Sequence, residues 1–295
     1  MISNKFFNGS PLFTTKLPLF QGTRAHNFII LRHEIVIMEK RLVFDIGMHI
    51  GQDSINDLLE GFRVLAVEAN PLLAQQNSVK FKKYIDDGSL TILNVGISDK
   101  EGILPFYINK RTSEWSSFDF QLGSRNNTPY EMKEIPCVTT ASLFKKYGVP
   151  YYLKVDIEGY DFYCINDLPE VKTGDGVKYV SCEATEVSLL DTLHARGYTK
   201  FKLIHQGFNF RPINLGLEKN PLFPLYLKVY TGLRLKFRNL IKSRYPYSSS
   251  GPIPENTKGE WITYEKARQL FVDFYQGEKL KPLNDKSWFD FQATY

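Results

Sequence analysis

Cysteine is scarce in this sequence, and long apolar runs are missing from it. Only three of the 295 residues are cysteine, at positions 137, 164 and 182, and no two of them form a C-x-x-C pair. An odd number of unpaired thiols favours a reduced, cytoplasmic compartment. Because no apolar run approaches the roughly 20 residues of a membrane span, we expect no transmembrane segment.

Acidic residues are missing from the start of the chain until Glu34, although lysines and arginines are present there. Such a composition is found in transit peptides, but Pro11 and Pro18 argue against the long amphipathic helix that a transit peptide forms. We predict a poorly ordered extension over residues 1–37, before a natural start at Met38. A targeting segment and an upstream start codon remain alternatives.

A second acid-free stretch runs from residue 219 to residue 254, and lysines and arginines accumulate in it. The helical spacing of Leu233, Phe237, Leu240 and Ile241 predicts a basic amphipathic helix. The plainest interpretation is a docked helix with a solvated basic face. A membrane-surface contact through 226–244 and a clamp for an acidic substrate are the alternatives.

Predicted strands and helices alternate through the middle of the chain, as in an α/β domain with a mostly parallel sheet. We assign residues 38–208 to this core, and residues 209–295 to a basic helical insertion and closing elements packed on the same domain. Pro105 marks 104–108 as an edge strand, and Trp288 to Gln292 is predicted to be another.

The usual phosphate-binding glycine patterns are also missing. Asp45, Gly47 and Gly51 form D-x-G-x-x-x-G between a buried strand and a helix. A P-loop needs a Lys-Ser/Thr pair after its last glycine, and a dinucleotide fingerprint needs glycine at position 49, which is His49. An acid at position 45 is hostile to phosphate and suits a cation.

A second acid follows at the end of the next predicted strand, in Val67-Glu68-Ala-Asn70-Pro. A carboxylate at this place accepts both ribose hydroxyls in dinucleotide folds. S-adenosylmethionine carries an ammonium, a sulfonium and a ribose but no phosphate, and it fits these residues best. The third strand ends at Asn94 and Gly96, which we expect to border the adenine.

Tyr151 to Gly159 is the second informative stretch. Strand periodicity places Lys154, Asp156 and Glu158 on one face if the strand runs that far, and Asp156 is a ready partner for the buried lysine. A buried Lys–Asp pair that only fixes strand register is the alternative. Glu183 ends a further strand, so these acids together with Glu68 predict the rim of a pocket for a cationic ligand.

Two other polar features have open roles. The loop Arg111–Asp119 carries Trp115, which either anchors a surface loop or closes over the cofactor and substrate. His205 follows a strand, where it would serve as an acid/base, contact the substrate, or bond to backbone.

Several of these motifs together resemble the FkbM-family methyltransferases. They are Val43-Phe-Asp-Ile-Gly…Gly51-Gln-Asp, Val67-Glu-Ala-Asn-Pro71, Asn94-Val-Gly-Ile-Ser98, Ser113-Glu-Trp-Ser-Ser-Phe118, Leu153-Lys-Val-Asp-Ile-Glu-Gly159 and Ser249-Ser-Gly-Pro252…Trp261. The resemblance implies the class I methyltransferase fold, which is Rossmann-like, with a mostly parallel seven-stranded sheet and helices on both faces. It also implies S-adenosylmethionine as cofactor.

By this resemblance, one group of residues would contact the cofactor and another would lie by the transferred methyl. The cofactor group is Asp45, Gly47, Glu68 and Asn94, with Ser116 and Ser117 near the methionine end, and we add Gly51 and Asn70 from the same motifs. The methyl that is transferred from S-adenosylmethionine would lie beside Lys154, Asp156 and Glu158.

Methylation of a hydroxyl benefits from a base, by about 10²–10⁴-fold. Asp156 is the first choice, with Lys154 orienting it, and Glu158 is the second. Alternatively, Asp156, Glu158 and Glu183 would bind Mg²⁺, which the spacing does not specifically indicate.

The predicted function is O-methylation of a sugar, glycan or small natural-product acceptor. A methyltransferase acting on protein or nucleic acid, or a non-catalytic binding module, is the alternative. Nucleic acid is the disfavoured partner.

Overall fold

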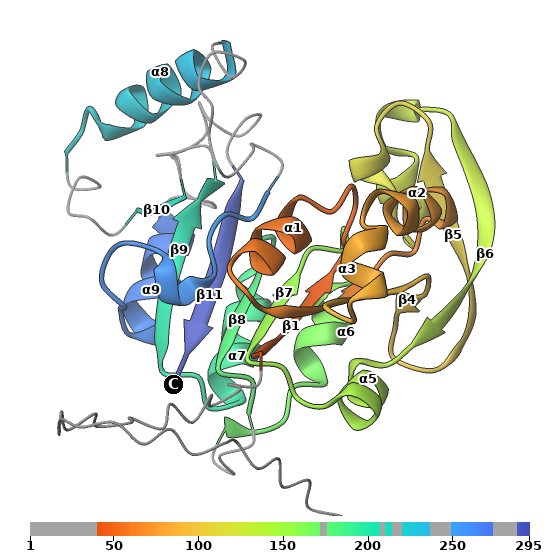
Figure 1. Cartoon of the computed structure of the whole chain (residues 1–295). Helices are drawn as coiled ribbons and strands as arrows, with labels where there is room; N and C mark the ends of the chain where they lie inside the picture. The colour runs from red at the N-terminus through yellow and green to blue at the C-terminus, as the bar shows by residue number, and fades with distance from the viewer. Residues whose placement is uncertain (1–39, 172–175, 207–209, 214–219, 237–248, 274–287) are drawn as a thin grey trace, which may run out of the picture. The chain divides into compact units, whose positions relative to one another are not determined.

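A computed structural model describes residues 40–171, 176–206, 210–213, 220–236, 249–273 and 288–295 (Figure 1). The extension expected over 1–37 lies outside these residues, as do Phe237, Leu240 and Ile241 of the predicted basic helix. In the described part of that region, helix α8 spans Phe223–Lys236.

The central feature is a sheet with the strand order β10-β9-β11-β8-β7-β1-β2-β3. Strands β3, β2, β1, β7 and β8 are parallel, while β11 is antiparallel to both β8 and β9. The strands are β1 (Leu42–Ile46), β2 (Arg63–Val67), β3 (Leu90–Leu93), β7 (Tyr152–Val155), β8 (Tyr179–Glu183), β9 (Lys200–His205), β10 (Arg211–Pro212) and β11 (Phe289–Thr294). The predicted fold class is confirmed, and the two-residue strand β10 adds an eighth strand to the seven expected.

Strand β11 is not at an edge, contrary to the prediction for Trp288–Gln292. It lies between β8 and β9, and all six of its residues are buried. Asp290 and Gln292 alternate with aromatic residues, and this alternation is typical of a strand with one exposed face. Both faces are nevertheless covered, and Asp290 accepts hydrogen bonds from Gln206.

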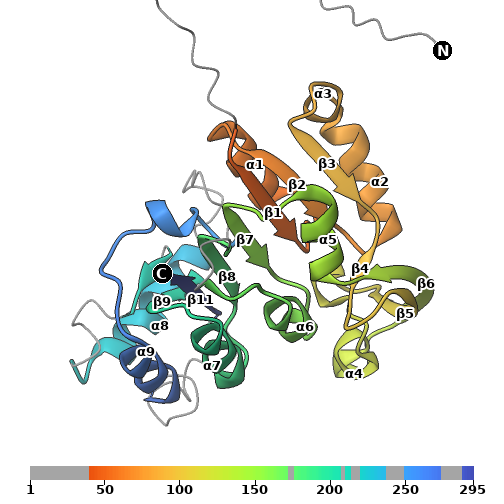
Figure 2. The same cartoon turned by 90° about the horizontal axis from the view of Figure 1, so that it is seen from below.

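Helices cover both faces of the sheet (Figure 2). The larger core lies between the sheet and the helices α5, α6, α7 and α9, and a second core lies between the sheet and the helices α1 and α3, while α2 lies beside α3. These helices are α1 (Gln52–Leu59), α2 (Pro71–Lys80), α3 (Lys82–Asp86), α5 (Thr140–Tyr147), α6 (Asp161–Asn166), α7 (Val187–Ala195) and α9 (Tyr264–Phe271).

A separate sheet of three strands lies beyond β3, with the order β4-β6-β5. Its strands are β4 (Gly96–Ile97), β5 (Gly102–Asn109) and β6 (Tyr130–Val138), and the short helix α4 (Phe120–Gly123) lies between β5 and β6 in the chain. The chain leaves the main sheet after Leu93, so the third predicted strand, which was expected to end at Asn94 and Gly96, is divided between two sheets. Strand β5 is an edge strand, as Pro105 predicts.

Lys154 is buried in β7, and its main partner is Asp45 in the neighbouring strand β1. The two residues are paired in the parallel register, and Nζ lies 3.1 Å from the Asp45 carboxylate. Nζ also donates to the carbonyl of Gly47 at 2.9 Å and lies 3.5 Å from Asp53. Asp156, the partner expected from sequence, is 3.7 Å away, because β7 ends at Val155 before Asp156 is reached.

Asp53 extends this network to the C-terminal part of the chain. Its carboxylate accepts hydrogen bonds from the Ser249 hydroxyl and from the backbone N–H of Ser250. Lys154 therefore connects β7, β1, helix α1 and the segment that begins at residue 249. Burial alone would lower the pKa of Lys154, but Asp45, Asp156 and Asp53 hold it well above its ordinary value.

We expect Lys154→Met to destabilise the fold by about 3–5 kcal/mol, because it leaves the buried carboxylates of Asp45 and Asp53 without their cation. Urea unfolding followed by circular dichroism measures this loss. Lys82→Met is the matched control, because Lys82 makes an exposed ion pair with Asp86 and should change stability little. Equal losses in the two variants would contradict the structural role of Lys154.

Gly51 precedes helix α1 with φ of 78°, and a Cβ there would lie 2.3 Å from the Phe81 ring. Gly61 has φ of 89° but nothing within 4 Å of such a Cβ. We therefore expect Gly51→Ala to cost about 1–3 kcal/mol more than Gly61→Ala, because both variants strain the backbone and only the first overpacks the core. Unfolding free energies of the two variants test this, and equal values would show that backbone strain alone decides both.

Candidate functional site

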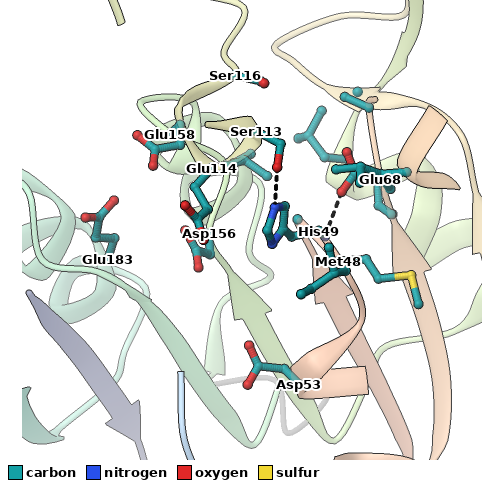
Figure 3. Close-up of a pocket in the computed structure, with 18 of the residues that line it drawn as sticks. Met48, His49, Asp53, Glu68, Ser113, Glu114, Ser116, Asp156, Glu158 and Glu183 are labelled. Carbon is teal, nitrogen blue, oxygen red and sulfur yellow. Dashed lines mark hydrogen bonds between the residues drawn. The ribbon is translucent and has the colours of Figure 1, made fainter. Parts of the chain in front are cut away.

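A cavity of about 440 Å³ lies at the carboxyl ends of β1, β2, β7 and β8 (Figure 3). The four acids that the sequence predicted for a pocket rim, Glu68, Asp156, Glu158 and Glu183, all line it. They come from three different strand ends and face one space, as the carboxyl edge of a parallel sheet arranges them.

The turn after β1 forms the floor of this cavity. Gly47 has φ of 89°, and a Cβ there would lie 1.9 Å from the carbonyl oxygen of Asp156. Glycine is therefore required by the close approach of the chain after β7. The backbone N–H groups of Gly47 and Met48 both donate to Val67 at the end of β2, which fixes the turn against the next strand.

Glu68 is held at the end of β2 by two backbone hydrogen bonds. One carboxylate oxygen accepts from the N–H of His49 and the other from the N–H of Asn70, each at 2.7 Å. Burial raises the pKa of Glu68 to about 7, although both hydrogen bonds oppose this rise. Asn70 also caps helix α2, and the side chain of Asn94 donates to the carbonyl oxygen of Glu68 at 2.8 Å.

His49 was not selected from the sequence, yet it connects three parts of the site. Its N–H binds Glu68, its carbonyl accepts from Asn77 on α2, and its ring Nε2 lies 2.8 Å from the Ser113 hydroxyl. Figure 3 shows the ring between Glu68 and Asp156. Burial lowers the pKa of His49, while the nearby Glu114 carboxylate opposes that effect. The sequence signal that could have identified His49 was its place inside the glycine motif, where a non-glycine residue is unusual. The structure shows His49 with φ of 50°, in the region that favours glycine.

The loop after β5 covers the cavity from the side of the smaller sheet. A single 3-10 turn spans Ser113–Trp115, and residues 113–116 all line the cavity. The Ser116 hydroxyl accepts a hydrogen bond from the N–H of Asn109 at 3.1 Å. Ser117 is fully buried and donates to the carbonyl of Glu158 at 2.7 Å, so it supports the site without lining it.

The acids opposite Glu68 have different surroundings. Glu158 has φ of 48° and forms an ion pair with Arg125, so it does not continue the face of β7 as the periodicity suggested. The guanidinium carbon of Arg125 lies 5.3 Å from the Trp115 ring centre. Burial, followed by the charges of Asp156 and Glu158, raises the pKa of Glu183 well above its ordinary value. Burial also raises the pKa of Glu158, against the effect of Arg125.

The described residues do not form the Mg²⁺ site that was the alternative expectation. Among the described residues, no three His, Cys, Asp or Glu side chains are grouped so that they could hold a metal ion. Asp156, Glu158 and Glu183 share the cavity, but Glu158 is engaged by Arg125.

Some predicted site residues do not line the cavity. They are Asp45, Gly51, Asn70, Asn94, Ser117 and His205. Asp45 is fully buried and accepts from Ser54 on α1 as well as pairing with Lys154. His205 is buried in β9 with its ring 4.6 Å from that of Phe289, and the next residue, Gln206, lines the cavity instead.

The apolar part of the lining was also not predicted. It includes Met48, Leu73, Val95, Ile97, Phe106 and Phe118. These residues come from the turn after β1, from α2, and from the smaller sheet and the segments beside it, so no local sequence pattern brings them together. Trp288, which lies near the C-terminal end of the chain and is 40% exposed, also lines the cavity.

The solved structures that this chain matches include methyltransferases. The [4+2]-cyclase SpnF has 9% identity and a TM-score of 0.35, with 88% of this chain and 76% of that chain covered. Phosphoethanolamine N-methyltransferase 2 of Haemonchus contortus, in complex with S-adenosyl-L-methionine, has 11% identity and a TM-score of 0.34, with 86% of this chain and 48% of that one covered. Precorrin-6y C5,15-methyltransferase of Geobacter metallireducens GS-15 has 12% identity and a TM-score of 0.29, with 56% and 68% covered.

A comparison with curated proteins finds no match. The family model described as the methyltransferase FkbM domain matches residues 45–200, which is more than half of the chain and contains the glycine turn, Glu68 and the Lys154–Glu158 stretch. The sheet is that of the class I methyltransferase fold. The chain therefore belongs to the FkbM methyltransferase family.

Proposed function

We propose that this protein is an S-adenosylmethionine-dependent methyltransferase that methylates a hydroxyl of a sugar, glycan or small natural product. The observation that carries the proposal is the position of Glu68. Its carboxylate lines the cavity at the end of β2, and both of its oxygens are fixed by backbone N–H groups.

The residues of the cavity fit this cofactor. Each Glu68 oxygen accepts one backbone hydrogen bond and retains a lone pair for a ribose hydroxyl. The apolar residues around Glu68 provide a surface for a base. Among the described residues, Lys154 is the only lysine or arginine in the lining, and carboxylates already surround it, so the cavity favours a cation and disfavours a phosphate.

The size of the cavity agrees with a small-molecule site. Its volume of about 440 Å³ falls within the range of roughly 300–1,000 Å³ for such sites. When bound, S-adenosylmethionine supplies a methyl group on a sulfonium. We assign its methionine end to the region of Gly47 and Ser116, and the acceptor to the side of the cavity that carries Trp115, Asp156 and Glu183.

Asp156 is the proposed base for the acceptor hydroxyl. It is half-buried on the cavity wall, its backbone N–H is fixed by the carbonyl of Ile46, and Lys154 lies 3.7 Å from its carboxylate. Lys154 is a positioning residue here, because Asp45 and Gly47 hold its ammonium in place. Glu158 is the weaker candidate, since its carboxylate already pairs with Arg125.

The acid lining also bears on the alternative acceptors. A nucleic-acid acceptor would bring phosphates toward the carboxylates of Glu114 and Asp156, which would repel them. A neutral hydroxylated acceptor donates hydrogen bonds to the same groups. The geometry therefore favours a neutral or cationic acceptor over a polyanion.

We expect Glu68→Gln to lower the affinity for S-adenosylhomocysteine at least about tenfold. The glutamine amide nitrogen would face one of two backbone N–H donors, so one of these hydrogen bonds is lost together with the ribose acceptor. Isothermal titration calorimetry measures the change, and the exposed Glu134→Gln is the control. Unchanged affinity in Glu68→Gln would remove the cofactor assignment.

The pH dependence of binding provides a second readout for the same residue. Because the pKa of Glu68 is raised to about 7, its carboxylate is ionised above that pH and protonated below it. Hydroxyl donors prefer the ionised form, so affinity should fall by up to about tenfold for each pH unit below 7. Glu68→Gln should lack this pH dependence. A wild-type affinity that does not change between pH 6 and pH 8 would contradict the role of the Glu68 carboxylate in binding.

We expect Asp156→Asn to reduce turnover by about 10²–10⁴-fold and to leave S-adenosylhomocysteine binding largely unchanged, because the amide cannot accept the hydroxyl proton. The measurement is S-adenosylhomocysteine release with a hydroxylated acceptor that the wild type methylates. Glu158→Gln is the comparison variant. A greater loss in Glu158→Gln than in Asp156→Asn would transfer the role of base to Glu158.

A further inference from the structure

Helix α8 presents an apolar stripe to the outside of the molecule. The stripe consists of Leu225, Tyr226, Val229 and Leu233 on the helix and of Leu222, which directly precedes it, and these residues are between 49% and 65% exposed. The spacing of three and four residues places the four helical residues on one side of the helix. A contiguous exposed apolar patch of this kind marks an interaction surface.

The other side of α8 is packed on the protein. Phe223 is only 3% exposed and belongs to the larger core, and Tyr230 packs against that core. The packed residues and the exposed stripe therefore lie on adjacent parts of the helix surface, with Lys228 on a third part. An exposed apolar surface of this extent is typical of a binding site for a partner surface.

The charge of this region indicates the chemistry of that partner. Residues 219–254 contain no acid, and their basic residues are Lys219, Lys228, Arg234, Lys236, Arg238, Lys242 and Arg244. This charge exceeds the net charge of +5 for the whole chain, so the remainder is net acidic. Lys228 is exposed on α8 itself.

We propose that the apolar stripe of α8 docks on a bilayer surface that contains anionic lipids. A second copy of the chain fits less well, because a two-fold interface would place this acid-free region against itself. An anionic bilayer offers apolar chains for the stripe and negative charge for Lys228, which is exposed beside it.

The dimensions of α8 agree with a helix lying in the plane of the surface. Its 14 residues extend about 21 Å, which is shorter than the roughly 30 Å hydrocarbon core of a bilayer. Within the ranges that the structure covers, no helix is long and apolar enough to cross a membrane. Figure 1 shows α8 at the end of the molecule toward which β1, β7 and β9 run, the end where the cavity lies.

Vesicle flotation with the full chain tests this proposal. The vesicles are pure phosphatidylcholine or phosphatidylcholine mixed with phosphatidylglycerol. We expect binding to the anionic vesicles only, weakened by added salt, and reduced about tenfold or more in Leu225→Ser/Val229→Ser/Leu233→Ser. Lys228→Glu should weaken binding to a smaller extent.

The matched control replaces equally exposed apolar residues away from α8. Leu59, Val79 and Ile103 are 63%, 75% and 67% exposed, and Leu59→Ser/Val79→Ser/Ile103→Ser should float as the wild type does. Unfolding midpoints identify any variant that is misfolded. Three results would overturn the proposal: no flotation of the wild type, equal flotation of the stripe variant, or a wild-type dimer in sedimentation velocity that the stripe variant abolishes. S-adenosylhomocysteine binding is independent of all three.

Discussion

The ion pair between Lys154 and Asp45 is the interaction on which the site depends. A charge removed from water costs several kcal/mol unless it is paired and hydrogen-bonded, and Lys154 meets this requirement with Asp45, Asp53 and the carbonyl of Gly47. Each partner belongs to a different element around the cavity floor. The cost of burying the lysine therefore makes the relative position of β1, β7 and α1 specific.

This network also explains why the distant segment at Ser249 belongs to the site. The Asp53 carboxylate lies near Lys154 and also accepts hydrogen bonds from the Ser249 hydroxyl and the Ser250 N–H, so the segment that begins at residue 249 is fixed on α1. Burial raises the pKa of Asp53, and Lys154 opposes that effect. Lys154 therefore also stabilises Asp53, a second buried acid, whose carboxylate binds the backbone N–H of Ser250.

The cavity above this floor has two chemically different sides. On one side Glu68 is held by backbone N–H groups within an apolar surround, and on the other Asp156, Glu158 and Glu183 lie close enough to repel one another. His49 lies between the two sides and connects the glycine turn to the loop at Ser113. A positive sulfonium would be attracted to these carboxylates, which agrees with the proposed methyl transfer.

The sequence by itself determined the fold class, the glycine turn and the four acids around the cavity. These features are local, because strand periodicity and a glycine that allows close approach can be recognised within ten residues. The sequence also placed Glu68 correctly at a strand end, since an acid directly after a buried apolar run has no other simple position.

Only the tertiary structure decided which partners these residues have. Lys154 pairs with Asp45 because parallel strands place them side by side, although 109 positions separate them and Asp156 is two positions away. His205, which was predicted for the site, is buried in β9, and the next residue, Gln206, lines the cavity in its place. The two side chains are adjacent in the chain, so the path of the backbone decides which of them faces the cavity. Strand β11 became central because β9 covers its second edge. Pairing across strands depends on register and neighbours, which no local pattern contains.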